Sequence, residues 1–247
     1  MEQEVKKVIA WVKEYVENSK AKGVVIGNSG GKDSAVVMAI AVNALGKENV
    51  LAVAMPCLSI DSDLEDAKLV ADTFGVKMIT TDLSKTYLEL ETEVQKSLNK
   101  EISTDSKINM KPRLRMTTLY SIAQTLGYLV IGTGNLCEAT VGYTTKWGDS
   151  AYDFNPIANF TVEEVLEIGK ILGVPEKIIK KAPNDGLGSG TDEEKMGVSY
   201  SQITEYINTG KTESKAMEII KELNKKSEHK RNPSPVYLYR RSTICKE

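Results

Sequence analysis

The stretch VVIGNSGGKDSAVVMAIAVNALG, residues 24–46, decides the fold of this chain. Together with Gly23, its first part is a short apolar run rich in β-branched residues, which predicts a buried strand over 23–27. Residues 33–45 then predict a helix that ends at Gly46. A strand that passes through a glycine-rich turn into a helix directs backbone N–H groups and the positive end of the helix dipole at one point. We therefore predict a phosphate loop over residues 27–34.

Strand-like runs and helical patterns alternate through the rest of the first 134 residues. Further strands are expected at 49–56, 76–82 and 128–134, and helices at 61–74, 83–100 and 114–126. This alternation predicts an α/β fold: a doubly wound, mainly parallel sheet of about five strands flanked by helices. Because such sheets bind ligands at the carboxyl ends of their strands, the glycine-bearing segments 27–34 and 132–138 are expected to face one crevice.

The C-terminal part of the chain is organised differently. Thr161 and Glu164 form a capping-box pattern that opens a helix, and a second helix is expected at about 214–228. Between them, KAPNDGLGSGTDEE is rich in Gly, Pro and Asp and is expected to be a binding loop. We expect a single domain over 1–247, with an α/β nucleotide-binding core at 1–154 and a helical part at 155–247 that carries the loop.

Composition argues against several classes of partner. The chain carries 32 Lys+Arg against 34 Asp+Glu, a formal net charge of −2, so no global field draws it to nucleic acid or to an acidic membrane. It shows neither an apolar run of transmembrane length nor a signal-peptide pattern, and its three widely spaced cysteines are expected to be reduced thiols in the cytoplasm. One histidine and no CxxC predict no conventional zinc site.

The glycine loop was compared with three phosphate-loop patterns, and it fits one. The Walker A pattern GxxxxGK[ST] fails because Ile26 and Asp33 occupy two of its defined positions, and GxGxxG fails as well. SGGKDS matches SGGxDS, so the loop resembles the pyrophosphate loop of the ATP pyrophosphatases, which are similar in fold to the adenine-nucleotide α-hydrolases. The resemblance implies that the loop grips the β,γ-pyrophosphate of ATP, which is cut between the α and β phosphates. The carboxylate of Asp33 beside phosphates points to an intervening Mg²⁺.

Further motifs narrow the family. NMKPRLRMTTLYSIAQ, VIGTGNLCEATVGYTTKWGD, DFNPIANFTVEEV, GTDEEKMGVSY and EHKRNPSP follow in order, and together they resemble ammonia-dependent NAD synthetase along nearly the whole chain. The resemblance implies that ATP adenylates the carboxylate of deamido-NAD and releases pyrophosphate, after which ammonia attacks the acyl adenylate to give NAD and AMP. Such a reaction needs no protein nucleophile, only positioned reactants and neutralised charge.

The resemblance also implies roles for individual positions. The implied ATP loop is Gly27, Asn28, Ser29, Gly30, Gly31, Lys32, Asp33 and Ser34, of which Lys32, Asp33 and Ser34 are expected to be catalytic. Further implied ATP contacts are Thr133, Val162 and Asn184, the implied Mg²⁺ ligands are Asp33 and Glu138, and the implied deamido-NAD contacts are Arg113, Lys146, Asp153, His229 and Lys230. Four of these positions have a plainer alternative: Glu138 could be a solvated acid at a helix start, Lys146 and Asp153 loop charges, and His229 a surface histidine. Arg115 is a weaker substrate or phosphate candidate than Arg113.

Three positions depart from the family pattern. The family usually has lysine where this chain has Val162, serine or threonine where it has Asn184, and glycine where it has Ser150. Either another cation replaces the missing lysine, with Lys180, Lys181 and Lys195 as candidates, or ATP binds more weakly. The departures leave two alternatives open: a related ATP pyrophosphatase that acts on another carboxylate or on tRNA, and a nucleotide sensor without catalysis. Cys137 beside Glu138 would be the thiol of a tRNA-thiolating enzyme.

Partners follow from the same resemblance. We expect no amidase domain within this chain, which implies free ammonia or ammonia from an unidentified partner. Members of the family are homodimers with the dinucleotide site at the subunit interface. The segment 116–126 is apolar on more than one face, which fits burial under a partner and fits a core helix equally well.

Overall fold

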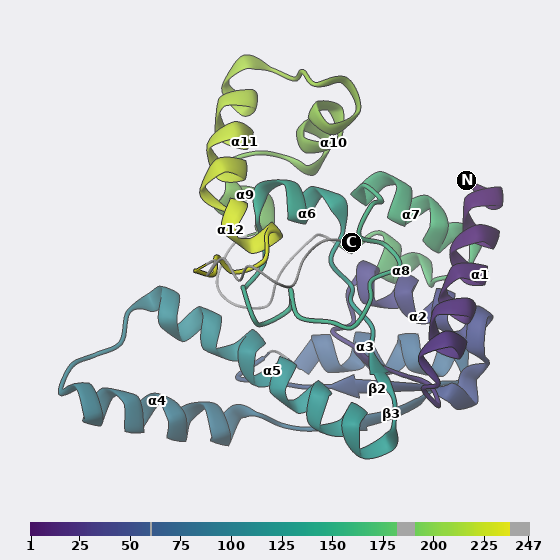
Figure 1. Ribbon diagram of the computed structural model, residues 1–247, viewed down its shortest axis with the longest axis horizontal. Coiled ribbons are helices and arrows are strands. Elements are labelled where there is room, and N and C mark those ends of the chain that lie inside the picture. Colours follow the sequence, from purple (N-terminus) through teal and green to yellow (C-terminus); the bar gives the residue numbers. More distant parts are fainter. Residues whose placement is uncertain (60, 182–190, 238–247) are drawn as a thin grey trace, which may run out of the picture.

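The computed structural model of this protein describes residues 1–59, 61–181 and 191–237. Its centre is a parallel sheet of four strands, β1 (Val24–Gly27), β2 (Val50–Ala54), β3 (Lys77–Thr80) and β4 (Leu129–Val130), in the order β3-β2-β1-β4 (Figure 1). Val24 pairs with Val50 of β2 on one side and with Leu129 of β4 on the other. The strand order therefore reverses at β1, and this switch point is where open α/β sheets bind ligands.

The described helices connect and cover these strands. In chain order they are α1 (Glu2–Ser19), α2 (Lys32–Leu45), the short η1 (Lys47–Asn49), α3 (Asp61–Phe74), α4 (Ser84–Leu98), α5 (Thr104–Leu126), α6 (Leu136–Val141), α7 (Val162–Ile171), α8 (Glu176–Ile179), α9 (Asp192–Met196), α10 (Tyr200–Thr209), α11 (Ser214–Lys226) and α12 (Glu228–Arg231).

Two apolar clusters cover the two faces of the sheet. On one face α2, whose residues 35–41 have no exposed surface, packs against α1 and α7 through side chains such as Val12, Val36 and Ile168. On the other face α4 and α5 cover Val25 and the neighbouring strands. Burial on both faces requires continuous apolar strands, as the run at 24–26 supplies. The predicted doubly wound α/β fold is confirmed.

Two elements differ in extent from their predicted ranges. Four strands are described where about five were expected, and β4 covers only two residues of the predicted 128–134 run. α5 begins ten residues before the predicted start, because Ser103 caps it by accepting a hydrogen bond from Ser106 N at 3.3 Å. Its first half is polar and contains Pro112, which hides the helical pattern from sequence reading.

The C-terminal helices form a separate layer above the carboxyl edge of the sheet (Figure 1). α6, α7, α10 and α11 share a third apolar cluster that includes Val162, Tyr200 and Ile220. Within the described ranges no helix has the length and apolarity needed to cross a membrane. The space between this layer and the sheet is where the site lies.

Candidate active site

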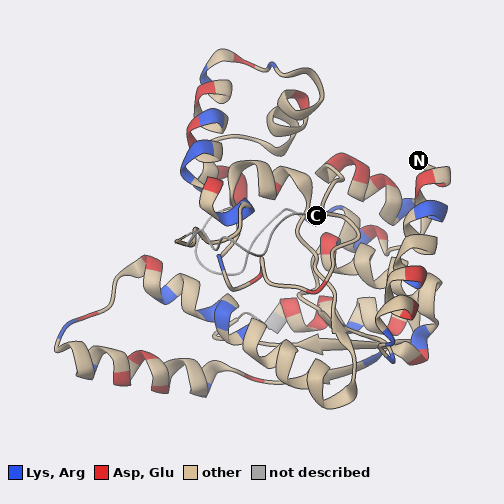
Figure 2. Cartoon of the chain, in the orientation of Figure 1, with Lys and Arg blue, Asp and Glu red and all other residues tan. Residues whose placement is uncertain are grey.

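A cavity of about 520 Å³ opens at the carboxyl ends of β1, β2 and β4. Its wall contains most of the glycine loop, residues 53–56 at the end of β2, residues 130–134 at the end of β4 and residues 142–145 after α6. The two glycine-bearing segments predicted to face one crevice therefore do so. Figure 2 marks acidic and basic residues on several of the elements around this region.

The loop is shaped by its own polar side chains. Asn28, 3% exposed, donates from Nδ2 to Ala67 O at 2.7 Å, while its Oδ1 accepts from Gly30 N at 3.3 Å. Ser34 Oγ donates to Gly31 O at 3.0 Å. Within the described part of the chain no side chain caps α2 at Gly31. The first N–H groups of α2 are thus directed into the cavity, which is the arrangement that binds phosphate.

Two carboxylates from distant segments meet at this helix end. Asn135, 1% exposed, donates from Nδ2 to Asp33 Oδ1 at 3.1 Å, and its backbone N–H donates to Glu138 Oε2 at 2.9 Å. Burial, and then the charge of Asp33, raise the pKa of Glu138 well above its ordinary value. A buried pair of acids that repel each other is stabilised by a cation between them.

The donor set suits Mg²⁺. No cluster of three or more His, Cys, Asp or Glu side chains able to hold a metal occurs among the described residues, so Asp33 and Glu138 are a pair. Mg²⁺ commonly binds through one or two carboxylates and takes its other ligands from water and substrate phosphates. A zinc or calcium site would use more protein ligands.

The bridging role of Asn135 gives a testable prediction. Asn135→Ser keeps a side chain that caps α6 but is too short to reach Asp33. Losing one hydrogen bond to a charged group corresponds to about a tenfold change in an equilibrium constant. We therefore expect the Mg²⁺ concentration for half-maximal activity to rise about tenfold, with little change in melting temperature. Thr161→Ser, in the capping box of α7, is the control. An unaltered Mg²⁺ titration of Asn135→Ser would contradict the bridge.

Lys32 lies between the loop and the C-terminal layer. Its side chain is nearly buried, with Nζ 3.5 Å from Asp33 Oδ2 and 5.4 Å from the centre of the Tyr200 ring. Asp192, 6% exposed, accepts hydrogen bonds from Tyr143 at 3.2 Å and Tyr200 at 3.5 Å. Burial and nearby carboxylates raise the pKa of Tyr200, so its hydroxyl stays protonated and remains a donor.

Four of the five predicted dinucleotide contacts come together at one rim of the cavity. Lys230 lines the wall and donates to the carbonyl oxygens of Gly142 and Thr144. Lys146 Nζ donates to His229 O at 2.8 Å, and Arg113 Nε donates to Lys146 O at 3.3 Å. This rim joins α5, the segment after α6, and α12.

The fifth predicted contact is placed differently. Asp153 accepts from Val130 N at 2.7 Å and from the Tyr120 hydroxyl at 3.3 Å, so it links β4 to α5.

Arg113 is exposed and lies outside the cavity wall, whereas Arg115 lines the wall and donates to Met55 O at 3.1 Å. Of the two arginines, the structure thus places Arg115 in the cavity wall, while the substrate role expected for Arg113 stays a prediction.

The predicted ATP contacts beyond the loop also separate. Thr133 lines the cavity. Val162 is buried in the apolar cluster with Met196 and Tyr200, away from the wall, so its placement lends no support to an ATP contact. Asn184 lies outside the described residues.

Several wall residues were missed by sequence reasoning. Asn135, Asp149 and Asp192 had no assigned binding role, yet each lies in or beside the cavity. The N-x-x-E spacing of Asn135 and Glu138 was a readable capping-box signal. Asp149 and Asp192 carried no local pattern that could have distinguished them from surface residues.

The position of Cys137 argues against thiol chemistry. Its side chain is fully buried in the apolar cluster, 3.5 Å from Thr204 Oγ1, and it is not part of the cavity wall. Burial raises the pKa of this thiol and so disfavours the reactive thiolate.

We expect Cys57 and Cys137 to resist a disulfide-exchange reagent at pH 8 in the folded protein, because both thiols are fully buried. The measurement uses a Cys245→Ser background, since Cys245 lies outside the described residues. Urea should expose two reactive thiols. Rapid labelling of Cys137 without urea, or loss of turnover in Cys137→Ala with the fold intact, would contradict this picture.

Comparison with known proteins agrees with the geometry. The NAD synthase family model matches residues 4–234. The NH(3)-dependent NAD(+) synthetase of Carboxydothermus hydrogenoformans is 42% identical over 93% of this chain and 95% of its own, and that of Pyrococcus horikoshii is 43% identical over 91% of each.

Two solved structures resemble the whole chain. NMN synthetase from Francisella tularensis superposes with a TM-score of 0.90 at 34% identity, covering 96% of this chain and 98% of that one. NH3-dependent NAD synthetase from Campylobacter jejuni superposes with a TM-score of 0.79 at 28% identity, with the same coverage. With its loop, its carboxylate pair and these matches, the chain belongs to the NAD synthase family.

Proposed function

We propose that this protein is an ammonia-dependent NAD synthetase, a ligase that converts deamido-NAD, ATP and ammonia into NAD, AMP and pyrophosphate. One observation carries the proposal: the SGGKDS loop and the carboxylates of Asp33 and Glu138 meet in a single cavity. The family relationship, with curated relatives of that name, supports it.

The first step activates the carboxylate. An oxygen of the nicotinate carboxylate attacks the α-phosphorus of ATP, and the bond between that phosphorus and the oxygen bridging to the β-phosphorus breaks. The electron pair leaves with pyrophosphate. The N–H groups at the start of α2 and the Lys32 ammonium are placed to bind the departing charge.

The second step forms the amide. The nitrogen of ammonia attacks the acyl carbon, the carbon–oxygen bond to AMP breaks, and the nitrogen loses one proton. The protein's task is to orient the two reactants and exclude water, which would otherwise hydrolyse the acyl adenylate.

Asp33 and Glu138 are the residues that would hold Mg²⁺, which when bound supplies positive charge to the phosphates. The capping hydrogen bond from Asn135 N–H uses Glu138 Oε2, and no described residue makes a hydrogen bond to Oε1, the oxygen that would bind the cation. Asn135 fixes both carboxylates relative to α2 before any substrate enters.

Isotope transfer tests the mechanism. Deamido-NAD labelled with ¹⁸O in both carboxylate oxygens should give AMP that carries one ¹⁸O and pyrophosphate that carries none, as measured by mass spectrometry. Label in inorganic phosphate, together with ADP, would mean acyl phosphate chemistry and would overturn the proposal. ATP binding without any pyrophosphate release would instead indicate a nucleotide sensor.

A second candidate substrate is nicotinic acid mononucleotide. The NMN synthetase superposes more closely on this chain than the Campylobacter NAD synthetase does, with TM-scores of 0.90 and 0.79. The chemistry at the carboxylate is the same for both substrates, so the difference lies in the adenylyl half. Competition between the two acids in one assay gives the ratio of kcat/KM directly, and we expect the dinucleotide to be preferred.

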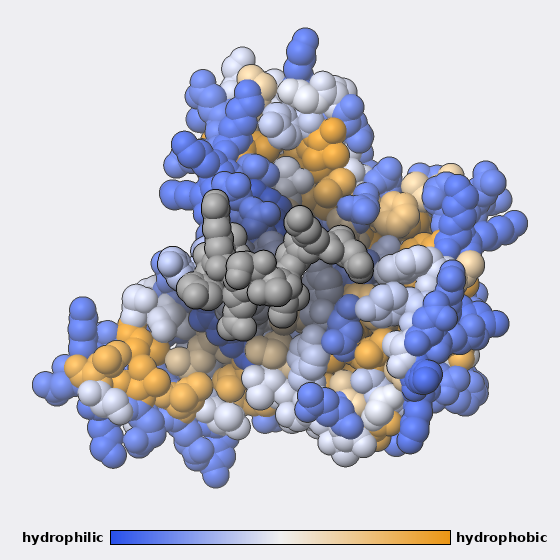
Figure 3. All heavy atoms as spheres, in the orientation of Figure 1, coloured by the Kyte–Doolittle hydropathy of each residue, from blue (hydrophilic) through white to orange (hydrophobic). Residues whose placement is uncertain are grey.

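A homodimer is part of the proposal. α4 and the first half of α5 extend from the body as an arm (Figure 1), and apolar surface is visible over this region in Figure 3. Leu88, Leu90 and Leu98 of α4 are exposed. Sedimentation equilibrium measures the assembly mass.

We further propose that the core and the C-terminal part work as one unit, because residues of both line the cavity. A cytoplasmic location is supported by the free thiols of Cys57 and Cys137. The ammonia is proposed to come from solution or from a partner protein.

A further inference from the structure

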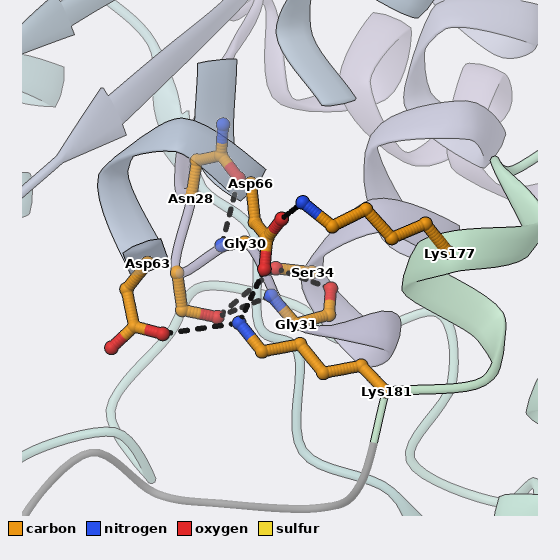
Figure 4. Close-up of polar contacts among 9 residues, drawn as sticks. Asn28, Gly30, Gly31, Ser34, Asp63, Asp66, Lys177 and Lys181 are labelled. Atoms are coloured by element: carbon orange, nitrogen blue, oxygen red, sulfur yellow. Dashed lines mark hydrogen bonds and ion pairs between the residues drawn. The ribbon is translucent and has the colours of Figure 1, made fainter. Parts of the chain in front are cut away.

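A lysine that follows α8 reaches the phosphate loop from a side different from that of Lys32. Lys181 lines the cavity, and its Nζ lies 3.0 Å from Asp63 Oδ1 and 2.7 Å from Asp66 Oδ2, both on α3 (Figure 4). Lys32, in contrast, faces the Tyr200 ring of α10.

The two aspartates are in direct contact with the loop. A Cβ built on Gly30 would lie 2.7 Å from Asp63 O and 2.8 Å from the Cβ of Asp66, so α3 packs tightly on the loop backbone. The carboxylates of Asp63 and Asp66 hold the ammonium of Lys181, so only these side chains separate it from the part of α3 that packs on the loop. A lysine in this position can bind a phosphate that the loop N–H groups also bind.

Asp66 has a second cation. Lys177 Nζ lies 2.6 Å from Asp66 Oδ1, and its side chain is 65% exposed. Burial would raise the pKa of Asp66, but hydrogen bonds from Lys177 and Lys181 outweigh it and lower the pKa. If Lys181 turned away, Asp66 would keep one ion pair, and Asp63, about one-quarter exposed, would meet solvent.

The charges along the described cavity wall make such a movement favourable. The wall holds five carboxylates, Asp33, Asp63, Glu138, Asp149 and Asp192, against four cations, Lys32, Arg115, Lys181 and Lys230. Triphosphate adds further negative charge. Lys230 and Arg115 donate to backbone carbonyls, and Lys32 is nearly buried. The ammonium of Lys181 is instead bound by carboxylates, and its four-carbon side chain is flexible.

We propose that Lys181 binds the β,γ-pyrophosphate of ATP by exchanging Asp63 for phosphate oxygen, and that it replaces the lysine that the family usually has at position 162. This deepens the proposed function and rests on it for the identity of the nucleotide. Val162 supplies no charge. Of the three lysines considered as substitutes, Lys181 lines the cavity, whereas Lys195 is not in its wall and Lys180 pairs with Glu176 on the surface.

The test measures binding separately from turnover. Calorimetry with Mg²⁺ and pyrophosphate, and then with Mg²⁺ and a non-hydrolysable ATP analogue, compares wild type with Lys181→Met, Lys181→Arg and Lys177→Met. We expect Lys181→Met to weaken both ligands at least tenfold and Lys181→Arg to restore affinity to within about threefold. Lys177→Met removes an ion pair of the same Asp66 and should bind within twofold of wild type. Asp63→Asn removes the competing carboxylate and should tighten binding.

Each outcome decides the proposal. If Lys181→Met and Lys177→Met weaken ligand binding equally, both lysines affect binding only by stabilising the fold through their ion pairs with Asp66, and the proposal is overturned. Unchanged binding in Lys181→Met would exclude a phosphate contact. If Lys181→Met fails to fold, then Lys181→Arg and Asp63→Asn decide: weaker binding in Asp63→Asn overturns the exchange. Wild type that binds the ligands but forms no amide would overturn the proposed function and leave the role of Lys181 tested.

Discussion

Asp33→Asn is expected to lower turnover by about 1,000-fold, the factor that corresponds to about 4 kcal/mol of lost transition-state stabilisation. The substitution keeps the size of the side chain and an oxygen that can accept the hydrogen bond from Asn135 Nδ2. It removes the negative charge that attracts Mg²⁺ to this oxygen ligand. The loss should therefore be of Mg²⁺-dependent activity and not of fold. Initial rates over a Mg²⁺ titration and the thermal unfolding midpoint measure the two effects separately.

A matched control separates catalysis from helix electrostatics. Asp105 also lies in the first turn of a helix, α5, but it is exposed and outside the cavity. Asp105→Asn loses a similar interaction with a helix dipole, worth about 0.3–1 kcal/mol. It should leave the Mg²⁺ titration unchanged. Near-wild-type turnover in Asp33→Asn would exclude Asp33 as an essential ligand.

Gly30→Ala should eliminate nucleotide binding at millimolar concentrations. Gly30 has φ +73°, and a Cβ there would lie 2.7 Å from Asp63 O and 2.8 Å from Ala67 N, which are backbone atoms of α3. The left-handed conformation alone costs a non-glycine residue about 1–2 kcal/mol. The close contacts add to that cost and force the loop away from α3, which moves its N–H groups. Calorimetry with pyrophosphate and chemical denaturation measure binding and stability.

Gly210→Ala is the control for this prediction. Gly210 has the same φ of +73°, and nothing lies within 4 Å of the Cβ that would be added. We expect it to lose only the conformational contribution to stability and to bind pyrophosphate like wild type. If Gly30→Ala kept its binding and lost no more stability than Gly210→Ala, the contact between the loop and α3 would have no functional importance.

Most of the fold was predictable because its signals are local. Residues 23–46 contain the strand, turn and helix of the phosphate loop within one short segment, and the structure places β1 and α2 there. The capping box of Thr161 and Glu164 was likewise readable from a spacing of three residues. The errors arose where the pattern was weak: polar residues and Pro112 concealed the first half of α5, and β4 covers only two residues.

The site was predictable only in part. Motif resemblance located the loop, Thr133, Glu138 and the rim around Lys146, all of which the structure brings to the cavity or its edge. It placed Arg113 above Arg115, although Arg115 is the one in the cavity wall. Both arginines lie on one helix, and only packing against the end of β2 decides which of them enters the wall.

The sequence by itself therefore determined the parallel α/β fold, the phosphate loop and the carboxylates that accompany it, since hydrophobic periodicity, glycine turns and caps act between near neighbours. Only the tertiary structure decided how these carboxylates are held and which further lysine lines the cavity beside the loop. Asn135 and Asp33 are 102 residues apart, and Lys181 and Asp66 are 115 residues apart. Hydrogen bonds and ion pairs of this kind depend on distances of about 3 Å between atoms of separate elements, and those distances exist only after the sheet and its helices have packed.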